Sequence, residues 1–166
     1  MVLTGHAQSI ESPNRQLNLT FHVDNGIPYY SLLYKGKIII EKSRLGFEMK
    51  NIPSMVDNFS ILKSSTSAFD ETWEPVWGEV KKIRNQYNEL EITLEQGSPK
   101  RTVIIRFRLY DDGLGFRYEF PNQKNLSYFT IAEEITQFNL GKDYTAFWIR
   151  GDYDTNEYNY TTSLLS

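Results

Sequence analysis

Residues 106–121, with the sequence RFRLYDDGLGFRYEFP, decide the fold of this chain. Apolar and polar residues alternate on both sides of the Asp-Asp-Gly centre, and a period of two is typical of a half-buried strand. An Asp-Gly pair between two such runs favours a tight antiparallel hairpin, because glycine readily adopts the positive φ of the turn. The expected inward-facing residues are Val103, Ile105, Phe107 and Leu109 before the turn, and Leu114, Phe116, Tyr118 and Phe120 after it. We therefore expect a long hairpin with one apolar face and one face of arginine and glutamate.

The same alternation predicts strands through most of the chain. The expected ranges are 17–23, 27–34 and 37–41, which form a meander, then 61–69, 80–87 and 88–96, and finally 128–138 and 144–150. The polar strand 61–69 is expected at a sheet edge, and Phe129, Ile131 and Ile135 are expected to face inward. Segment 44–59 is irregular and should cross between sheets with at most one helical turn. About ten strands with turns between them predict an all-β fold, an antiparallel β-sandwich.

Composition argues against several classes of protein. The chain has 166 residues, a formal net charge of −3 and no basic run, so we expect no nucleic-acid partner. No apolar stretch approaches the ~20 residues that span a bilayer, so we expect no membrane partner. The lack of cysteine excludes disulfides and thiolate metal sites.

The two ends of the sequence suggest processing and truncation. Ala7 follows a short run of apolar and small residues, so residues 1–8 are interpreted as a signal-peptide remnant or a leader, and residues 9–166 as the sandwich. The last residues, 158–166, contain no turn or capping signal. We expect the sandwich to be incomplete on its C-terminal side and to belong to a longer polypeptide.

Two tryptophans form the first candidate site. Trp73 and Trp77 are four residues apart, and Pro75 between them excludes a helix. In an extended segment the two indoles would face the same side and could stack against a sugar ring. Two such large side chains could instead plug one end of the core. Both interpretations stay open at this point.

The sequence contains no complete catalytic motif. It has no GxSxG, Walker or HExxH motif, and His6 and His22 are its only histidines. His22 falls on the polar face of a predicted strand, where we expect a surface residue. Glu133 and Glu134 would point to opposite faces of a strand, so they cannot form an acid–base pair. The acidic loop 152–157 lacks the spacing of an EF-hand and is expected to be solvated.

Three ordered motifs resemble the N-terminal domain of glycoside hydrolase family 97. The first is WEPVWGE at 73–79, running into IRNQYNEL at 83–90. The second is the central hairpin at 107–121, and the third is WIRGDYDTNE at 148–157. The resemblance extends from Gln8 to the end of the chain.

This resemblance implies a galactose-mutarotase-like super-sandwich, the N-terminal part of an exported, periplasmic and exo-acting α-glucosidase or α-galactosidase. The family's (β/α)8 barrel with its catalytic carboxylates would follow Ser166, so no catalytic residue and no cofactor are expected in this chain. Calcium is implied for the full-length enzyme, with its ligands mostly in the barrel. The sandwich would pack on the barrel and help to wall a pocket for an α-linked oligosaccharide. Open strand edges would let the isolated chain self-associate.

The candidate carbohydrate or pocket-wall residues lie in the first and third motifs. They are Trp73, Trp77, Trp148, Arg150, Asp152, Asp154 and Glu157. The loop 148–157 is the best candidate for the wall, with an ordinary domain-interface loop as the alternative. Two other functions stay open: a stand-alone carbohydrate-binding module, and a mutarotase-like enzyme, which would need a histidine and a carboxylate.

Overall fold

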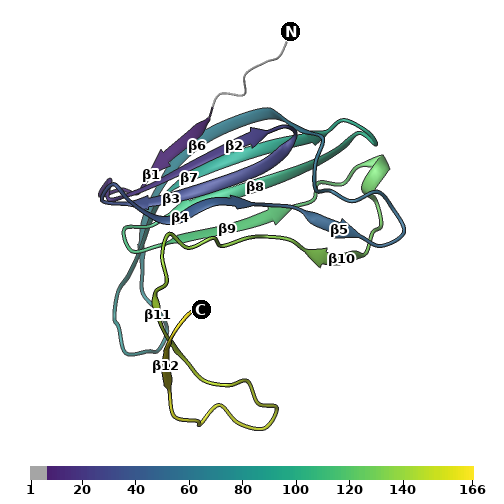
Figure 1. Ribbon diagram of the computed structural model, residues 1–166. Coiled ribbons are helices and arrows are strands. Elements are labelled where there is room, and N and C mark those ends of the chain that lie inside the picture. The colour runs from purple at the N-terminus through teal and green to yellow at the C-terminus, as the bar shows by residue number, and fades with distance from the viewer. Residues whose placement is uncertain (1–6) are drawn as a thin grey trace.

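The computed structural model describes residues 7–166, which form two packed four-stranded β-sheets and two smaller two-stranded sheets (Figure 1). The strands are β1 Gln8–Glu11, β2 Leu17–Asp24, β3 Ile27–Tyr34, β4 Lys37–Arg44, β5 Phe47–Met49, β6 Phe59–Trp73, β7 Ile83–Gln96, β8 Arg101–Leu109, β9 Leu114–Glu119, β10 Ile131–Glu134, β11 Thr145–Trp148 and β12 Thr161–Leu164; η1, Lys124–Leu126, is a short 3-10 turn. Antiparallel sheets of order β1-β2-β3-β4 and β6-β7-β8-β9 pack face to face. The predicted all-β sandwich is confirmed.

Aromatic rings from both sheets meet in the core. The ring centres of Phe21 in β2 and Tyr30 in β3 each lie 6.0 Å from that of Phe107 in β8, and all three residues are fully buried. Buried and half-buried residues alternate along all of β8, because its apolar side chains point to the opposite sheet. Removal of this apolar area from water is the main force that holds the sheets together.

The predicted meander is confirmed and is larger than expected. Asn25 and Gly26 both have positive φ at the β2–β3 turn, as a two-residue hairpin loop requires. A Cβ at Gly26 would lie 2.8 Å from the backbone nitrogen of Asn58, so glycine also permits a close backbone approach. β1 adds a strand beside β2, and β4 continues to Arg44.

The N-terminal boundary differs slightly from the prediction. Gln8 pairs with Phe21 and therefore belongs to the sandwich rather than to a leader. Residues 1–6 of the predicted leader lie outside the described residues. The range 7–166 holds no helix with the length and apolar character needed to cross a bilayer.

The β8–β9 hairpin has the predicted strands but a different turn. Residues 110–113 connect the strands, and the Tyr110 N–H donates to the Gly113 carbonyl at 2.8 Å. Gly113 does not have positive φ, so the predicted tight Asp-Gly turn is wrong. The longer loop still pairs Leu109 with Leu114, and this register keeps the apolar residues of both strands on one face.

The predicted strands 80–87 and 88–96 are a single strand, β7, which pairs with β6 along its whole length. The polar residue Asn88 does not interrupt it, because Asn88 stays paired with Ala68 and donates from its side chain to the Glu11 carbonyl at 2.8 Å. β6 is confirmed as a polar strand at the sheet edge.

The chain after β9 returns to cover the edge of the first sheet. β10 pairs with β5, and Leu140 then bridges to Ile40 of β4. Segment 44–59 thus contributes the strand β5 and, in the described structure, has no helical turn. Phe129 packs against the core as predicted, whereas Ile131 is 40% exposed, because β10 lies outside the two main sheets.

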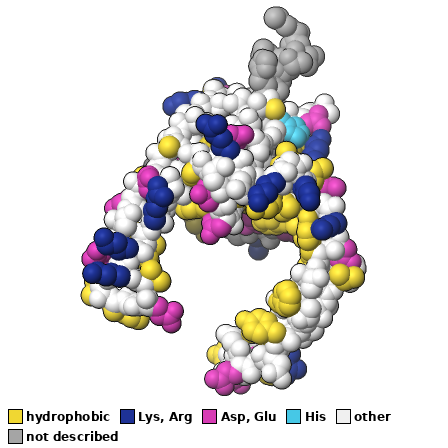
Figure 2. All heavy atoms as spheres, turned by 90° about the vertical axis from the view of Figure 1, so that its left-hand side faces the viewer, with side chains coloured by type: hydrophobic (Ala, Val, Ile, Leu, Met, Phe, Trp, Pro, Cys, Tyr) yellow, Lys and Arg dark blue, Asp and Glu magenta, His cyan; other side chains and the backbone are white. Residues whose placement is uncertain are grey.

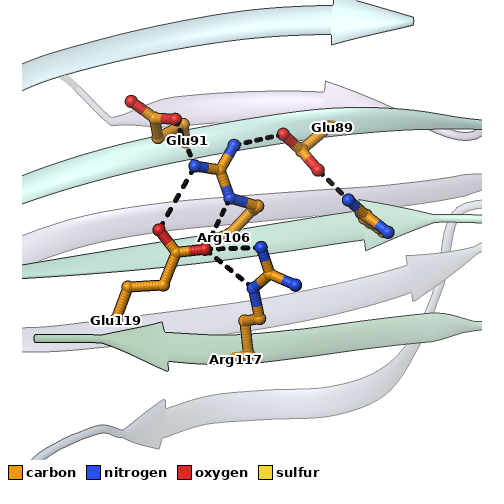
Figure 3. A network of polar contacts seen from close by, with 6 residues as sticks. Glu89, Glu91, Arg106, Arg117 and Glu119 are labelled. Atoms are coloured by element: carbon orange, nitrogen blue, oxygen red, sulfur yellow. Dashed lines mark hydrogen bonds and ion pairs between the residues drawn. The ribbon is translucent and has the colours of Figure 1, made fainter. Parts of the chain in front are cut away.

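The outward face of the second sheet carries a network of ion pairs (Figure 3). Its members are Glu89 and Glu91 of β7, Arg106 and Arg108 of β8, and Arg117 and Glu119 of β9. Nitrogens of Arg106 lie 2.5 Å from Glu89, 2.7 Å from Glu91 and 3.0 Å from Glu119. Burial raises the pKa of Glu89, but hydrogen bonds from Arg108 and Arg106 outweigh it, so the pKa lies below its ordinary value. The predicted charged face of the hairpin is confirmed.

Candidate functional site

Two arms leave the sandwich on the same side and flank an open hollow (Figures 1 and 2). The ribbon arm, residues 69–87, is the outer part of β6 and β7 with the loop between them. The C-terminal arm, residues 145–164, consists of β11, β12 and the loop between them. All of the predicted site residues lie on these two arms, and none lies in the sandwich core.

The C-terminal arm brings Trp148, Arg150 and Asp152 together with Tyr158. The guanidinium of Arg150 lies 4.1 Å from the centre of the Tyr158 ring, which is a cation–π contact. The Tyr158 hydroxyl donates to Asp152 Oδ2 at 2.6 Å. The Trp148 Nε1–H donates to Ser163 Oγ at 3.1 Å, which ties the indole to the opposite strand.

A pocket of about 310 Å³ on the C-terminal arm lies beside these contacts. It is lined by Trp148, Arg150, Tyr158, Asn159 and Thr161. The indole offers an apolar face to the C–H groups of a sugar ring, and the guanidinium, amide and hydroxyl groups can bond to its oxygens. This volume is at the small end of ligand pockets, which suits one sugar unit rather than a chain.

The Asp152 carboxylate and the Thr155 hydroxyl accept hydrogen bonds within the loop of this arm. The hydrogen bond from Tyr158 lowers the pKa of Asp152, and the Asp154 backbone N–H, which donates at 2.9 Å, adds to the effect. The Glu157 N–H donates to Thr155 Oγ1 at 3.0 Å. Among residues 7–166, no three histidine or acidic side chains form a group that could hold a metal ion.

The two tryptophans of the ribbon arm do not lie in one extended segment. Trp73 ends β6 and Trp77 lies in the following loop, and they are 46% and 87% exposed. The chain must leave the ladder here to turn back at Ile83 into β7. The interpretation of these residues as a plug of the core is wrong.

Sequence reasoning missed Tyr158, Asn159 and the strand β12. The run Thr161-Thr162 was a weak signal, because β-branched residues favour strands. It was too short to predict a partner for β11. His22 stacks on Tyr29 within the sandwich, at 5.7 Å between ring centres, and lies on neither arm.

The fold and the arms define a class of protein: a β-sandwich domain with two projecting hairpins. Residues 10–166 match the family described as "Glycosyl-hydrolase 97 N-terminal". The chain belongs to glycoside hydrolase family 97, as the N-terminal domain of these enzymes.

Solved structures agree with this assignment. Two are of a family 97 enzyme from Pseudoalteromonas sp. strain K8, one a variant in complex with panose and one in complex with acarbose. Each is 32% identical to this chain with a TM-score of 0.87, and the match covers 94% of this chain and 24% of that chain. A β-arabinopyranosidase is 30% identical with a TM-score of 0.75, over 84% of this chain and 22% of that chain. The chain thus spans about a quarter of the length of these enzymes.

Proposed function

We propose that this chain is the non-catalytic N-terminal β-sandwich of a secreted, exo-acting α-glycosidase. It packs on a (β/α)8 catalytic barrel of the same polypeptide and helps to wall the substrate pocket. Family membership and the greater length of the matched enzymes support this role. Glycoside cleavage needs two carboxyl groups at a fixed separation, which the strand ends of a barrel can hold.

The C-terminal arm is the observation that carries the proposal. Arg150 is backed by the Tyr158 ring, and Tyr158 is held in turn by Asp152. These residues lie on an arm outside the sandwich, and they line a pocket whose volume suits one sugar unit. Such an arm can contact a sugar bound on a neighbouring domain, but it supplies no pair of catalytic carboxylates.

The proposed ligand is an α-linked oligosaccharide. The complexes of the Pseudoalteromonas enzyme with panose and acarbose favour an α-glucoside. The match to a β-arabinopyranosidase keeps α-galactosides as the second choice, because arabinopyranose has a ring like that of galactose. We further propose a periplasmic enzyme whose calcium ion is bound outside this chain, on the basis of the family resemblance.

The test is a joined enzyme, in which this chain replaces the quarter of the Pseudoalteromonas enzyme that it matches. We expect the joined enzyme, but not the isolated chain, to hydrolyse an α-glucoside. The change Arg150→Ala should lower kcat/KM by about 10- to 100-fold, since a hydrogen bond from a charged group contributes ~1.5–3 kcal/mol. The matched control Lys124→Ala, in η1, removes a positive charge away from the arms and should have no effect. Hydrolysis by the isolated chain would contradict the proposal.

A stand-alone carbohydrate-binding module is the second candidate, and the exposure of Trp73 and Trp77 favours it. Calorimetry of the isolated chain with maltooligosaccharides separates the two functions. Millimolar or tighter binding that is lost in Trp77→Ala indicates a module, whereas an absence of binding supports the pocket wall.

A further inference from the structure

The ribbon arm extends beyond the sheet that supports it. β8 pairs with β7 only from Asn88 onward, whereas β6 stays paired with β7 as far as Ile83. Between the pair Phe69–Tyr87 and the pair Trp73–Ile83, the described structure therefore has only β6 and β7, and no third strand pairs with them. A two-stranded hairpin by itself is at best marginally stable in water.

Side chains at the base of the arm set its direction. The Phe69 and Tyr87 rings stack with 5.2 Å between their centres, and the guanidinium of Arg108 lies 4.4 Å from the Tyr87 ring centre. Arg84 donates two hydrogen bonds to Asp70 across the strands, at 2.9 and 2.7 Å. The base is thus joined to the sandwich, while the tip projects away from it.

The tip of the ribbon arm is apolar and open to water. Val76 is fully exposed, Trp77 is 87% exposed and Val80 is 57% exposed. Apolar side chains are visible at the ends of both arms in Figure 2. Exposed apolar residues that are near one another in the chain can mark an interaction site, and tryptophan is enriched among the residues that dominate interface energy.

We infer that the tip formed by Val76, Trp77 and Val80 anchors this domain on a second folded domain of the same polypeptide. This inference rests on the proposed function and names the surface that makes the contact. The length of the matched enzymes points to this partner, because roughly three quarters of the Pseudoalteromonas chain lies outside the matched part. Both arms flank one hollow, so a single convex domain can contact both of them (Figure 2).

The structure favours a protein partner over a sugar at this tip. A sugar platform needs rings that are already held in place, whereas Trp77 lies in a loop and its indole has no hydrogen-bond or ring partner among the described residues. A pocket on a docked domain would order this side chain by enclosing it. The carbohydrate-contacting role therefore belongs to the C-terminal arm, where Trp148 is tied down by Ser163.

The absence of cysteine from the chain permits a direct test. The change Val76→Cys places a thiol at the tip, and Tyr128→Cys places a control thiol at a residue that is 89% exposed and follows η1. The η1 segment is the short green helical turn at the side of the sandwich away from the ribbon arm (Figure 1). Both are reacted with a thiol reagent, in the isolated chain and in the joined enzyme, and the labelled peptide is identified by mass spectrometry. We expect equal rates in the isolated chain, and a rate at position 76 that falls at least about tenfold in the joined enzyme while position 128 is unchanged.

Each of the other outcomes contradicts either the docking inference or the proposed function. If the joined enzyme is active and position 76 still reacts at the rate of the isolated chain, the docking inference fails and the proposed function stands. If the joined enzyme has no activity and its sedimentation coefficient is that of an elongated particle with undocked domains, the proposed function itself fails. Slower labelling of the isolated chain at high concentration would assign the tip to a second copy, and slower labelling with panose would assign it to a sugar; either result overturns the inference.

Discussion

The sandwich and the ribbon arm are built from the same strands but have opposite environments. Within the sandwich, β7 lies between β6 and β8, and Leu94 is fully buried. From Tyr87 back to Ile83 the same strand has β6 alone as a neighbour, and its residues change from buried at Tyr87 to exposed at Arg84 and Ile83. The pairing of β6 with β7 therefore continues to Ile83, although the residues at that end are exposed. The long two-stranded ladder and its exposed apolar tip are the observations behind the proposed docking surface.

The largest expected contrast is between one aromatic residue of each region. Phe107→Ala should lower the free energy of unfolding by about 3–5 kcal/mol, because it empties the centre of the core. Trp77→Ala in the isolated chain should change it by less than about 0.5 kcal/mol, since the side chain buries little surface. Urea unfolding followed by circular dichroism measures both. Equal losses would show that the arm is part of the cooperative unit.

A second contrast concerns charge. Glu89→Gln should cost about 1–3 kcal/mol, because Arg106 and Arg108 lose a shared and buried carboxylate partner. Glu74→Gln on the ribbon arm breaks an exposed pair with Lys82 at 3.8 Å and should leave the melting temperature unchanged. Thermal unfolding at low and high salt checks both variants. A loss in Glu89→Gln that vanished at high salt would argue against a buried network.

Acid should weaken the sandwich through the same network. The pKa values of Glu89 and Glu119 lie below the ordinary 4.5 in the folded state, although burial opposes the shift in both. The unfolded chain therefore binds more protons below pH 4.5, so the stabilisation is complete above that pH and is lost as the pH falls through the folded pKa values. The double variant Glu89→Gln/Glu119→Gln should flatten the acid side of a stability–pH curve. An acid side that keeps its slope in the double variant would contradict this prediction.

The smallest expected effect is weak self-association of the isolated chain. β6 and β9 end their sheet with open edges, and such edges can pair with another copy. Sedimentation velocity should show dimers or larger species that grow with concentration and that persist in Trp77→Ser, because backbone pairing rather than the tip drives them. A strictly monomeric profile would contradict this prediction.

The three motifs that indicated the family were visible in the sequence because each combines a strand with an unusual turn or loop. The site was only partly predictable. Trp148, Arg150 and Asp152 were selected as candidates, but Tyr158, which lies beneath Arg150 and holds Asp152, was not. No local pattern reveals that the loop brings residue 158 back to residue 150.

The sequence by itself determined which residues face the core and which carry charge, because alternation along a strand is a local property. Only the tertiary structure decided where a strand ends and what it meets. Arg101 shows the difference: it opens β8 and is polar, yet it is fully buried, where it donates to the Gln96 side chain and to the Ser54 carbonyl. The Ser54 partner of Arg101 comes from a segment distant in the chain. The place where β8 stops pairing with β7 is likewise set by tertiary structure, and the alternation of residues along a strand contains no information about either.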